Sequence, residues 1–297
     1  MIISCKPLPI RKERRLTLRS DMTIAAGILC SDGIIICADT EHTGDVSKFQ
    51  ASKIIPLDEH AVLTGSGTTD YIQMTADKLR DEFKAARPAS PSEARQIVER
   101  VVKGIHAEHI FNFFDASDPN RPFIDLIVGV RCSSGDLALI KTNNSVARLG
   151  TNFEFTGSGF PIFEYWCRYF YCDRLTMAGM ATLALFILKE VKKVHPYCGG
   201  TSQVFHLPKV EGMPKVSRIF DEDQILLGFP DNIVKILSAC FFEDTPTAWI
   251  EEKLHEFATG VRAIHQGELF RKTYNLPNVE MRDLAKPSDS QKSEGPQ

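Results

Sequence analysis

The sequence has 297 residues, of which 43% are hydrophobic and 25% are charged, and its formal net charge at pH 7 is -3. This composition is that of an ordinary globular protein with enough chain to bury a large core. The small net charge gives no electrostatic reason to expect nucleic acid or a membrane surface as a partner.

Residues 1–22 are expected to form an N-terminal extension, either a propeptide or a stretch upstream of the true start. They are basic, contain two prolines and show neither helical nor strand periodicity. The basic run at 11–15 is not followed by an apolar segment, so no secretory signal is predicted. The eight cysteines are scattered and several lie in apolar runs, which favours thiols in a reducing compartment. A cytoplasmic location is therefore expected.

Residues 23–39 read as two apolar strands joined by a Ser-Asp-Gly turn. Centring the turn on Asp32 places Asp39 opposite Ala25, diagonal to Thr23 on the same face and about 7 Å from it. A slip of one residue would move Asp39 to the other face. Both faces of this hairpin are mostly apolar, which predicts that both are covered, as in a layered sandwich.

Strands and helices then alternate in blocks. Further strands are expected at 53–57, 61–64, 123–130, 137–140, before 156–159, at 203–207 and at 216–220. Helices are expected from about 70 to 83, from Pro91 to about Phe113 with Ser90 as cap, from Phe163, and from Thr176 to about Val194. Segregated blocks of this kind favour an α+β fold, a four-layer α-β-β-α sandwich of two antiparallel sheets over residues 23–232. Residues 233–274 are expected to be a helical extension and 275–297 a disordered tail.

Thr23 would combine a hydroxyl nucleophile with its own amine base if it became the N-terminal residue. An α-amino group titrates at about 7.7 to 8.0, close to working pH, so it can accept a proton from the hydroxyl. Translation starting at Met22, followed by removal of that methionine, would expose Thr23 because threonine is small.

Several short patterns follow one another in a fixed order. They are Thr23 with Gly27, Asp39, Ser52-Lys53-Ile54, Leu63-Thr64-Gly65 and Thr156-Gly157-Ser158-Gly159. From Thr23 to Phe220 this series resembles the catalytic, beta-type proteasome subunits and, equally, the peptidase of the bacterial two-component ATP-dependent protease. The resemblance implies an N-terminal-nucleophile (Ntn) hydrolase, a threonine-type endopeptidase of unfolded polypeptides that needs no metal or cofactor. It also implies homo-oligomeric stacked rings, with an ATPase unfoldase as a candidate partner.

The resemblance assigns roles to five residues. Thr23 takes the place of the nucleophile, and Lys53 that of the lysine whose charge keeps the amine neutral and stabilises nearby negative charge. Asp39 would hold Lys53 charged and oriented. The backbone N–H of Gly65 would stabilise the oxyanion, and Ser158 would position the Thr23 amine.

Two departures from the family pattern stand out. The family's D-x-x-S-G segment falls at 195–199, where His195 and Cys198 replace the aspartate and the serine. This weakens the network that handles protons, although the bacterial peptidase also lacks that aspartate. Met22 stands where processed proteasome precursors usually have glycine, which suggests initiation at Met22.

Simpler interpretations compete with this one. Thr23 can be an ordinary strand residue, and Asp39 with Lys53 a structural ion pair. The glycine-rich segments lack a Walker lysine and a complete G-x-G-x-x-G, which argues against a nucleotide site. His106 and His109 have no third ligand nearby, which argues against a metal site.

Two other functions stay open: a non-catalytic ring subunit that keeps residues 1–21, and an amidase of the same fold acting on a small substrate.

Overall fold

The computed structural model describes residues 23–43, 48–115, 117–118, 121–172, 174–211, 216–220 and 246–265. The chain divides into two compact units, Met1–Gly228 and Phe229–Gln297. In the second unit the described residues form one helix, α7 (Thr247–His265), inside the predicted helical extension. The predictions for residues 1–22 and for the tail lie outside the described residues. None of the described helices is both long and apolar enough to cross a bilayer.

The first unit contains two five-stranded antiparallel sheets, which agrees with the predicted α+β class. The first sheet has the order β10 (Phe153–Thr156), β1 (Ala25–Cys30), β2 (Gly33–Asp39), β11 (Ser202–Pro208), β12 (Val216–Phe220). The second has the order β5 (Ile54–Pro56), β6 (Ala61–Gly67), β7 (Ile124–Arg131), β8 (Leu137–Asn143), β9 (Val146–Leu149). A short hairpin of β3 (Glu41–Thr43) and β4 (Lys48–Gln50) follows β2.

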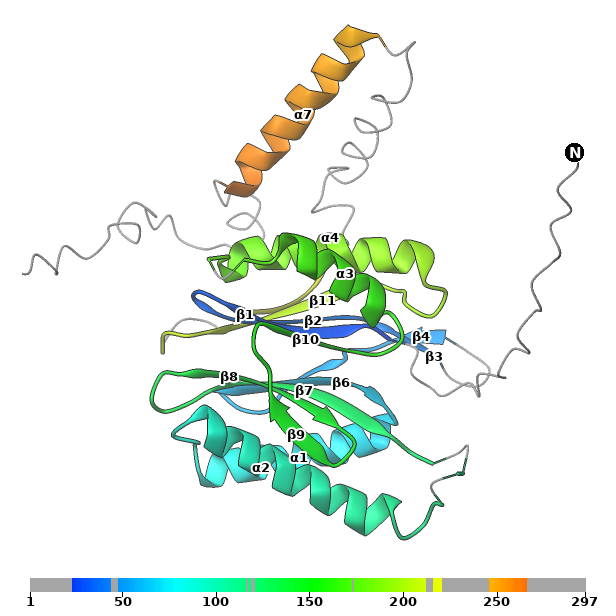
Figure 1. Ribbon diagram of the computed structural model, residues 1–297, viewed down its shortest axis with the longest axis vertical. Helices are drawn as coiled ribbons and strands as arrows, with labels where there is room; N and C mark the ends of the chain where they lie inside the picture. Colours follow the sequence, from blue (N-terminus) through cyan, green and yellow to red (C-terminus); the bar gives the residue numbers. More distant parts are fainter. Residues whose placement is uncertain are drawn as a thin grey trace, which may run out of the picture. The chain divides into compact units, whose positions relative to one another are not determined.

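Two pairs of helices cover the outer faces of the sheets, which lie face to face (Figure 1). The helices α1 (Thr69–Ala85) and α2 (Pro91–Ile105) pack on the second sheet, and a π-helical turn (His106–Ile110) continues α2. The helices α3 (Phe160–Phe170) and α4 (Met177–Val194) belong to the first sheet, with α3 against β10 and α4 against β2 and β11.

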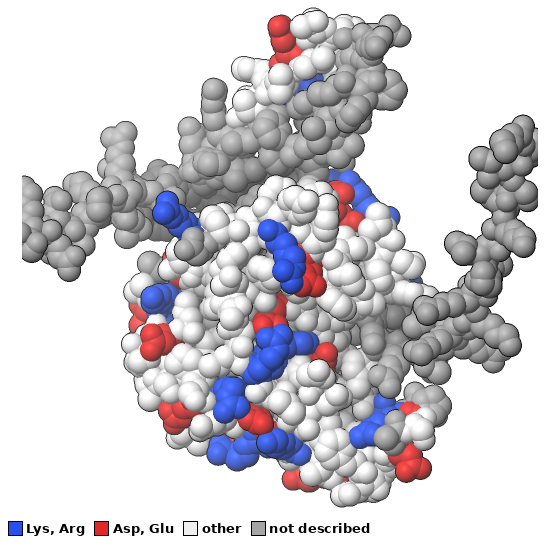
Figure 2. All heavy atoms as spheres, viewed as in Figure 1, with Lys and Arg blue, Asp and Glu red and all other residues white. Residues whose placement is uncertain are grey.

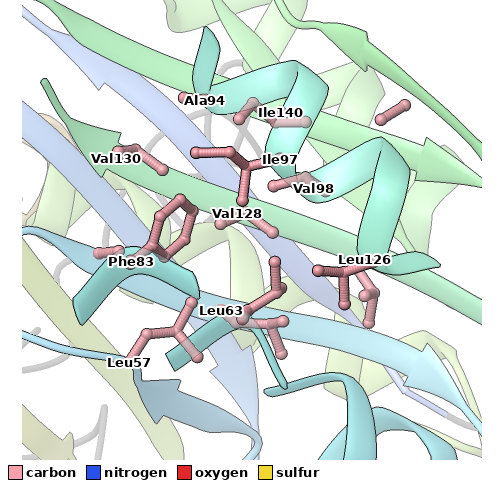
Figure 3. Packing of buried hydrophobic residues seen from close by; sticks show 14 of the residues in the cluster. Leu57, Leu63, Phe83, Ala94, Ile97, Val98, Leu126, Val128, Val130 and Ile140 are labelled. Carbon is pink, nitrogen blue, oxygen red and sulfur yellow. The ribbon is translucent and has the colours of Figure 1, made fainter. Parts of the chain in front are cut away.

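Alternation along the strands builds two apolar layers. Figure 3 shows Ile97 and Val98 of α2 packed over Val128 and Ile140 of the second sheet. The opposite face of that sheet packs against the first sheet through a second cluster: Ala25, Ile34, Ile36, Ala38, Ile54, Val62, Ile127, Leu139, Phe205 and Leu207. Burial of both faces of a sheet explains why the strands read as nearly continuous apolar runs.

Most charged side chains lie at the surface and are mixed in sign, whereas a few are buried: Asp39, Lys53, Arg131, Lys141 and Glu154. Figure 2 shows Lys and Arg interspersed with Asp and Glu on the face that it draws. Many of them form local pairs, such as Arg168 with Glu164 at 2.6 Å along α3. Exposed pairs of this kind contribute little to stability.

The predicted register of the first hairpin is wrong by one residue. Ala25 pairs with Ala38, and Cys30 pairs with Gly33, so the turn consists of Ser31 and Asp32 alone. Asp39 was expected to pair with Ala25, but it lies one residue further along β2 than Ala38, the actual partner of Ala25. The contact between Asp39 and Thr23 forms nevertheless, because Ile24 exchanges hydrogen bonds with Asp39 and the adjacent Thr23 hydroxyl reaches the same carboxylate.

Candidate functional site

Three of the five predicted residues meet in one triangle of hydrogen bonds. The Thr23 hydroxyl Oγ1 donates to Asp39 Oδ1 at 2.7 Å and accepts from Lys53 Nζ at 2.6 Å. Lys53 Nζ also donates to Asp39 Oδ1 at 2.7 Å. The three residues are 5%, 0% and 9% exposed for Thr23, Asp39 and Lys53, so these bonds form with little water around them.

Asp39 is the centre of the arrangement, at the last position of β2. Beyond the triangle, its Oδ1 accepts the backbone N–H of Ile24 at 3.1 Å, and its Oδ2 accepts the N–H of Gly199 at 3.1 Å. A buried carboxylate needs such donors, because an unpaired charge in the interior is costly. Lys53 comes from the second sheet, just before β5, so the triangle joins the two sheets.

Burial lowers the pKa of Lys53 below its usual value, and the charge of Asp39 opposes that change. A lysine with a lowered pKa holds its proton less firmly than an exposed one. Because Nζ already donates to the Thr23 hydroxyl, it is placed to stabilise negative charge that develops on Oγ1.

The loop between β10 and α3 faces the backbone of Thr23. The Thr23 carbonyl accepts the N–H of Gly159 at 3.2 Å, whereas the Ile24 carbonyl accepts the N–H of Asp39 on the other side. Gly157 has a φ of 88°, and a Cβ there would lie 2.3 Å from the Thr23 carbonyl oxygen. Only glycine suits this position.

Ser158 lies in that same loop, between Gly157 and Gly159, which both lie against the Thr23 carbonyl. Its Oγ is buried and has no hydrogen-bond partner among the described residues. A buried hydroxyl without a partner is unusual and asks for an explanation.

The backbone N–H of Gly65 points toward Lys53. Gly65 pairs with Leu126 of β7, and the N–H of Leu126 points to β8, where it donates to Thr142 Oγ1 at 2.8 Å. In an antiparallel pair of this type both residues direct their N–H groups away from each other. The N–H of Gly65 is therefore directed to β5, opposite the backbone of Lys53, since Ile54 pairs with Thr64.

Gly67 was not predicted from the sequence to be a site residue. Because the N–H groups along a strand alternate in direction, the N–H of Gly67 points to the same side as that of Gly65. The N–H of Thr68 points the other way and donates to the Phe123 carbonyl at 3.0 Å. The pairing of β5 ends at Ile54, so Gly67 lies past the end of that strand. Its φ of 124° requires glycine. The signal available in the sequence was the second glycine of Gly-Ser-Gly, directly before the helix α1.

His195 and Cys198, the two departures from the family pattern, lie beside the triangle. The Cys198 Sγ is 3.4 Å from His195 Nδ1, and the next residue, Gly199, donates to Asp39. Burial first, and then the charge of Asp39, raises the pKa of Cys198 to about 12. Its thiol is therefore protonated at neutral pH and is not an activated nucleophile.

A metal site is not evident within the parts of the chain that the structure describes, where no cluster of three His, Cys, Asp or Glu side chains has the required arrangement. His106 is buried, with Nδ1 2.9 Å from the Val102 carbonyl of its own helix. The described site thus consists of a hydroxyl, a carboxylate, an ammonium group and backbone N–H groups.

Comparisons with known proteins find similarity to proteasome subunits. The family described as proteasome subunit matches residues 22–207. The proteasome subunit alpha of Methanococcus maripaludis is 31% identical over 173 residues, which cover 57% of this chain. The chain spans 64% of the length of that relative. Because the family match extends over more than half of the chain and includes Thr23, Asp39 and Lys53, the chain belongs to the proteasome subunit family.

Proposed function

We propose that this chain is a threonine-type endopeptidase subunit in which Thr23 becomes the N-terminal nucleophile. The observation that carries the proposal is the bond from Lys53 Nζ to Thr23 Oγ1 at 2.6 Å, with Asp39 completing the triangle. An ordinary strand threonine does not need a buried lysine at its hydroxyl. We also propose that the two sheets and their helix pairs form the four-layer sandwich of an Ntn hydrolase.

The chemistry follows from the positions of these groups. The Thr23 amine takes the proton of Oγ1 while Oγ1 forms a bond to the scissile carbonyl carbon. The amine then gives that proton to the leaving nitrogen as the C–N bond breaks, which leaves an ester on Thr23. Water, deprotonated by the same amine, attacks the ester and releases the second product, so the enzyme returns to its initial state.

Two backbone groups are candidates for the oxyanion donor. The resemblance assigns this role to Gly65, whose N–H is directed to the Lys53 backbone. Gly67 has the same orientation but lies past the end of β5, next to the N-terminus of the helix α1. We favour Gly67, because a strand does not cover its N–H and the helix dipole there also stabilises negative charge.

Membership of the proteasome subunit family also supports a proposal about binding partners. We expect stacked homo-oligomeric rings that enclose the sites, polypeptide substrates, and an ATPase unfoldase that delivers them. We also propose a cytoplasmic location, which the scattered cysteines in apolar runs favour. Native mass and electron microscopy of the purified protein would test the rings.

The first experiment compares protein expressed from Met1 with protein expressed from Met22. We expect the shorter form to lose its methionine, to hydrolyse fluorogenic peptides and to be modified at Thr23 by a threonine-directed epoxyketone. Thr23→Ala should remove both activities, whereas the control Thr182→Ala, on the helix α4, should keep them. Peptide hydrolysis that survives Thr23→Ala would reject the mechanism.

A second candidate function is a non-catalytic ring subunit. In the present chain Thr23 follows residue 22 through a peptide bond, and it is only 5% exposed. The curated relative is named an alpha subunit, whereas the catalytic resemblance is to beta-type subunits. Protein isolated from its native host that still carries residues 1–22 would favour this second function. Cleavage of small amides but not of peptides would favour an amidase.

A further inference from the structure

Lys53 lies at the end of a segment that is not part of a strand, although its ammonium group is held in the triangle. The strand β5 begins at the next residue, Ile54, which pairs with Thr64 of β6. A lysine side chain is a flexible stem of four carbon atoms, so its ammonium group reaches a fixed place only if the backbone that carries it is also fixed. The contacts that fix the backbone of Lys53 are therefore part of the geometry at Thr23.

Side-chain hydrogen bonds hold this backbone from both sheets. The Thr64 hydroxyl Oγ1 donates to the Lys53 carbonyl at 2.9 Å. The Ser52 Oγ donates to the Ile54 carbonyl at 2.8 Å and lies 2.9 Å from Gln203 Oε1 of β11, in the first sheet. The bonds of Ser52 hold the residues on either side of Lys53, whereas the bond from Thr64 acts on Lys53 itself.

Thr64 is a polar residue at a position where the neighbouring side chains are apolar. Side chains alternate along β6: Leu63 belongs to the cluster under α1 and α2 (Figure 3), whereas Val62 belongs to the cluster between the sheets. Thr64 comes two residues after Val62, so it faces the other sheet, and it is fully buried. A buried hydroxyl is costly unless it is hydrogen-bonded, and this one donates to the Lys53 carbonyl. Packing alone does not explain the hydroxyl, because valine has nearly the same shape.

The direction of the Thr64 hydroxyl is set by the sheet. Thr64 is paired on both sides, with Ile54 of β5 and with Ile127 of β7. A β-branched side chain has a restricted χ1 angle, which keeps the hydroxyl directed at the Lys53 carbonyl. A donor held in place on β6 thus fixes the carbonyl of Lys53.

We propose that Thr64 is a positioning residue for the reaction at Thr23. Its hydroxyl holds the backbone of Lys53 so that Nζ lies within hydrogen-bond distance of both Thr23 Oγ1 and Asp39 Oδ1. Loss of this hydroxyl lets Nζ move away from Oγ1, where it stabilises developing negative charge. The inference rests on the proposed function of Thr23, since it gives Thr64 a part in the same reaction.

The kinetic test compares variants of protein that is expressed from Met22. Thr64→Val should lower kcat for a fluorogenic peptide by about tenfold and leave KM within about twofold, because the displaced group acts on the reacting hydroxyl and not on bound peptide. Thr64→Ser, which keeps the hydroxyl, should restore most of kcat. Thr75→Val is the matched control and should keep kcat. Thr75 is also fully buried, and its Oγ1 donates to the Tyr71 carbonyl at 2.6 Å within the helix α1.

A second measurement does not depend on activity. Urea denaturation of Thr64→Val, Lys53→Met and the variant with both changes forms a double-mutant cycle. Thr64→Val should shift the urea midpoint less in the Lys53→Met background than in the unchanged protein, because the ion pair with Asp39 is already absent there. Thr75→Val should cause the same shift in both backgrounds.

Three results would overturn the proposal. They are a full kcat in Thr64→Val, a loss of kcat no larger than that of Thr75→Val, and additive shifts in the Thr64–Lys53 cycle. Circular dichroism of each variant would show that the fold is retained.

The two proposals fail in different ways. Protein that exposes Thr23 and hydrolyses no peptide would contradict the peptidase function, and the cycle would still decide whether Thr64 positions Lys53. An active peptidase in which Thr64→Val behaves as Thr75→Val does would contradict only the role of Thr64.

Discussion

Lys53 and Asp39 belong to different sheets, yet Lys53 Nζ lies 2.7 Å from Asp39 Oδ1, and the side chains are 6% and 0% exposed. This buried ion pair is also the support of the Thr23 hydroxyl. Burial of two charges is costly, and the attraction between them offsets that cost only where the geometry is good. The additional N–H donors from Ile24 and Gly199 supply part of that geometry.

Removal of the lysine charge should destabilise the protein. Lys53→Met leaves the Asp39 carboxylate buried without its cation, and we expect the free energy of unfolding to fall by about 3 kcal/mol. Lys48→Met is the control, because the Lys48 side chain is 51% exposed in its pair with Glu41 and should cost less than about 1 kcal/mol. Urea denaturation would measure both. Equal midpoints for the two variants would contradict the role given to the buried pair.

A comparison of two glycines isolates the contact with Thr23. Gly157 and Gly135 have φ values of 88° and 86°, but a Cβ at Gly157 would lie 2.3 Å from the Thr23 carbonyl oxygen, whereas Gly135 has no atom within 4 Å. Gly135→Ala should cost about 1 kcal/mol from backbone strain alone. Gly157→Ala should cost more and should slow the labelling of Thr23 by an epoxyketone. Similar thermal melts and labelling rates for the two variants would show that the contact is unimportant.

The thiol of Cys198 should be inert despite its place beside the triangle. Burial raises the pKa of Cys198 to about 12, and Cys172 is exposed. Because the thiolate is the reactive species, we expect iodoacetamide at pH 8 to modify Cys172 and to spare Cys198 in the native protein. Mass spectrometry of digested samples would compare the two sites, with urea-unfolded protein as the reference. Rapid native modification of Cys198 would contradict its burial.

Stability should decrease in mild acid. Burial lowers the pKa of His206 from 6.5 to about 4, and it also lowers the pKa values of His42, His60 and His106. As the pH falls, the unfolded chain therefore binds protons at these histidines at a higher pH than the folded chain does. The stabilisation is complete above about pH 6.5 and is lost as the pH falls toward 4. His206 alone should account for a loss of about 2 kcal/mol by pH 5.

Thermal melts between pH 7.5 and pH 5 would measure this dependence. His206→Gln should reduce the slope of melting temperature against pH, whereas the control Thr182→Ala, on the helix α4, should keep it. A melting temperature that is constant over this range, or that rises in acid, would contradict the burial of His206.

Local patterns in the sequence predicted much of the fold. Ser90 caps α2 as expected, with its Oγ accepting the N–H of Glu93, because capping depends on residues close in sequence. Thr176 likewise precedes α4, which ends at Val194 as predicted. The helix α3 begins at Phe160, three residues earlier than expected, because Gly159 starts it directly after the loop that contacts Thr23.

The hairpin shows the limit of such reasoning. The contact of Thr23 with Asp39 was predicted from a register that is wrong by one residue, since sequence does not distinguish a two-residue turn at Ser31 and Asp32 from a longer one. The backbone of Asp32 accepts the N–H of Lys209, and its side chain accepts that of Met177. These partners are far away in sequence, so local turn preferences carry no information about them.

The site residues that were missed depend on pairing between distant strands. The direction of the Gly67 N–H follows only from the order β6-β7-β8 and from the bond of Leu126 to Thr142. The donation from Gly199 to Asp39 spans 160 residues of sequence. The roles of Thr23, Asp39, Lys53, Gly65 and Ser158 in catalysis stay predictions until the kinetic experiments are done.

The division of the triangle between two sheets has a consequence for the newly made chain. A folding intermediate that has assembled only the sheet of β1 and β2 holds a threonine and an aspartate but no ammonium group. If Thr23 is the nucleophile proposed above, such an intermediate lacks the cation that supports its hydroxyl, so the proposed activity requires both sheets to be in place.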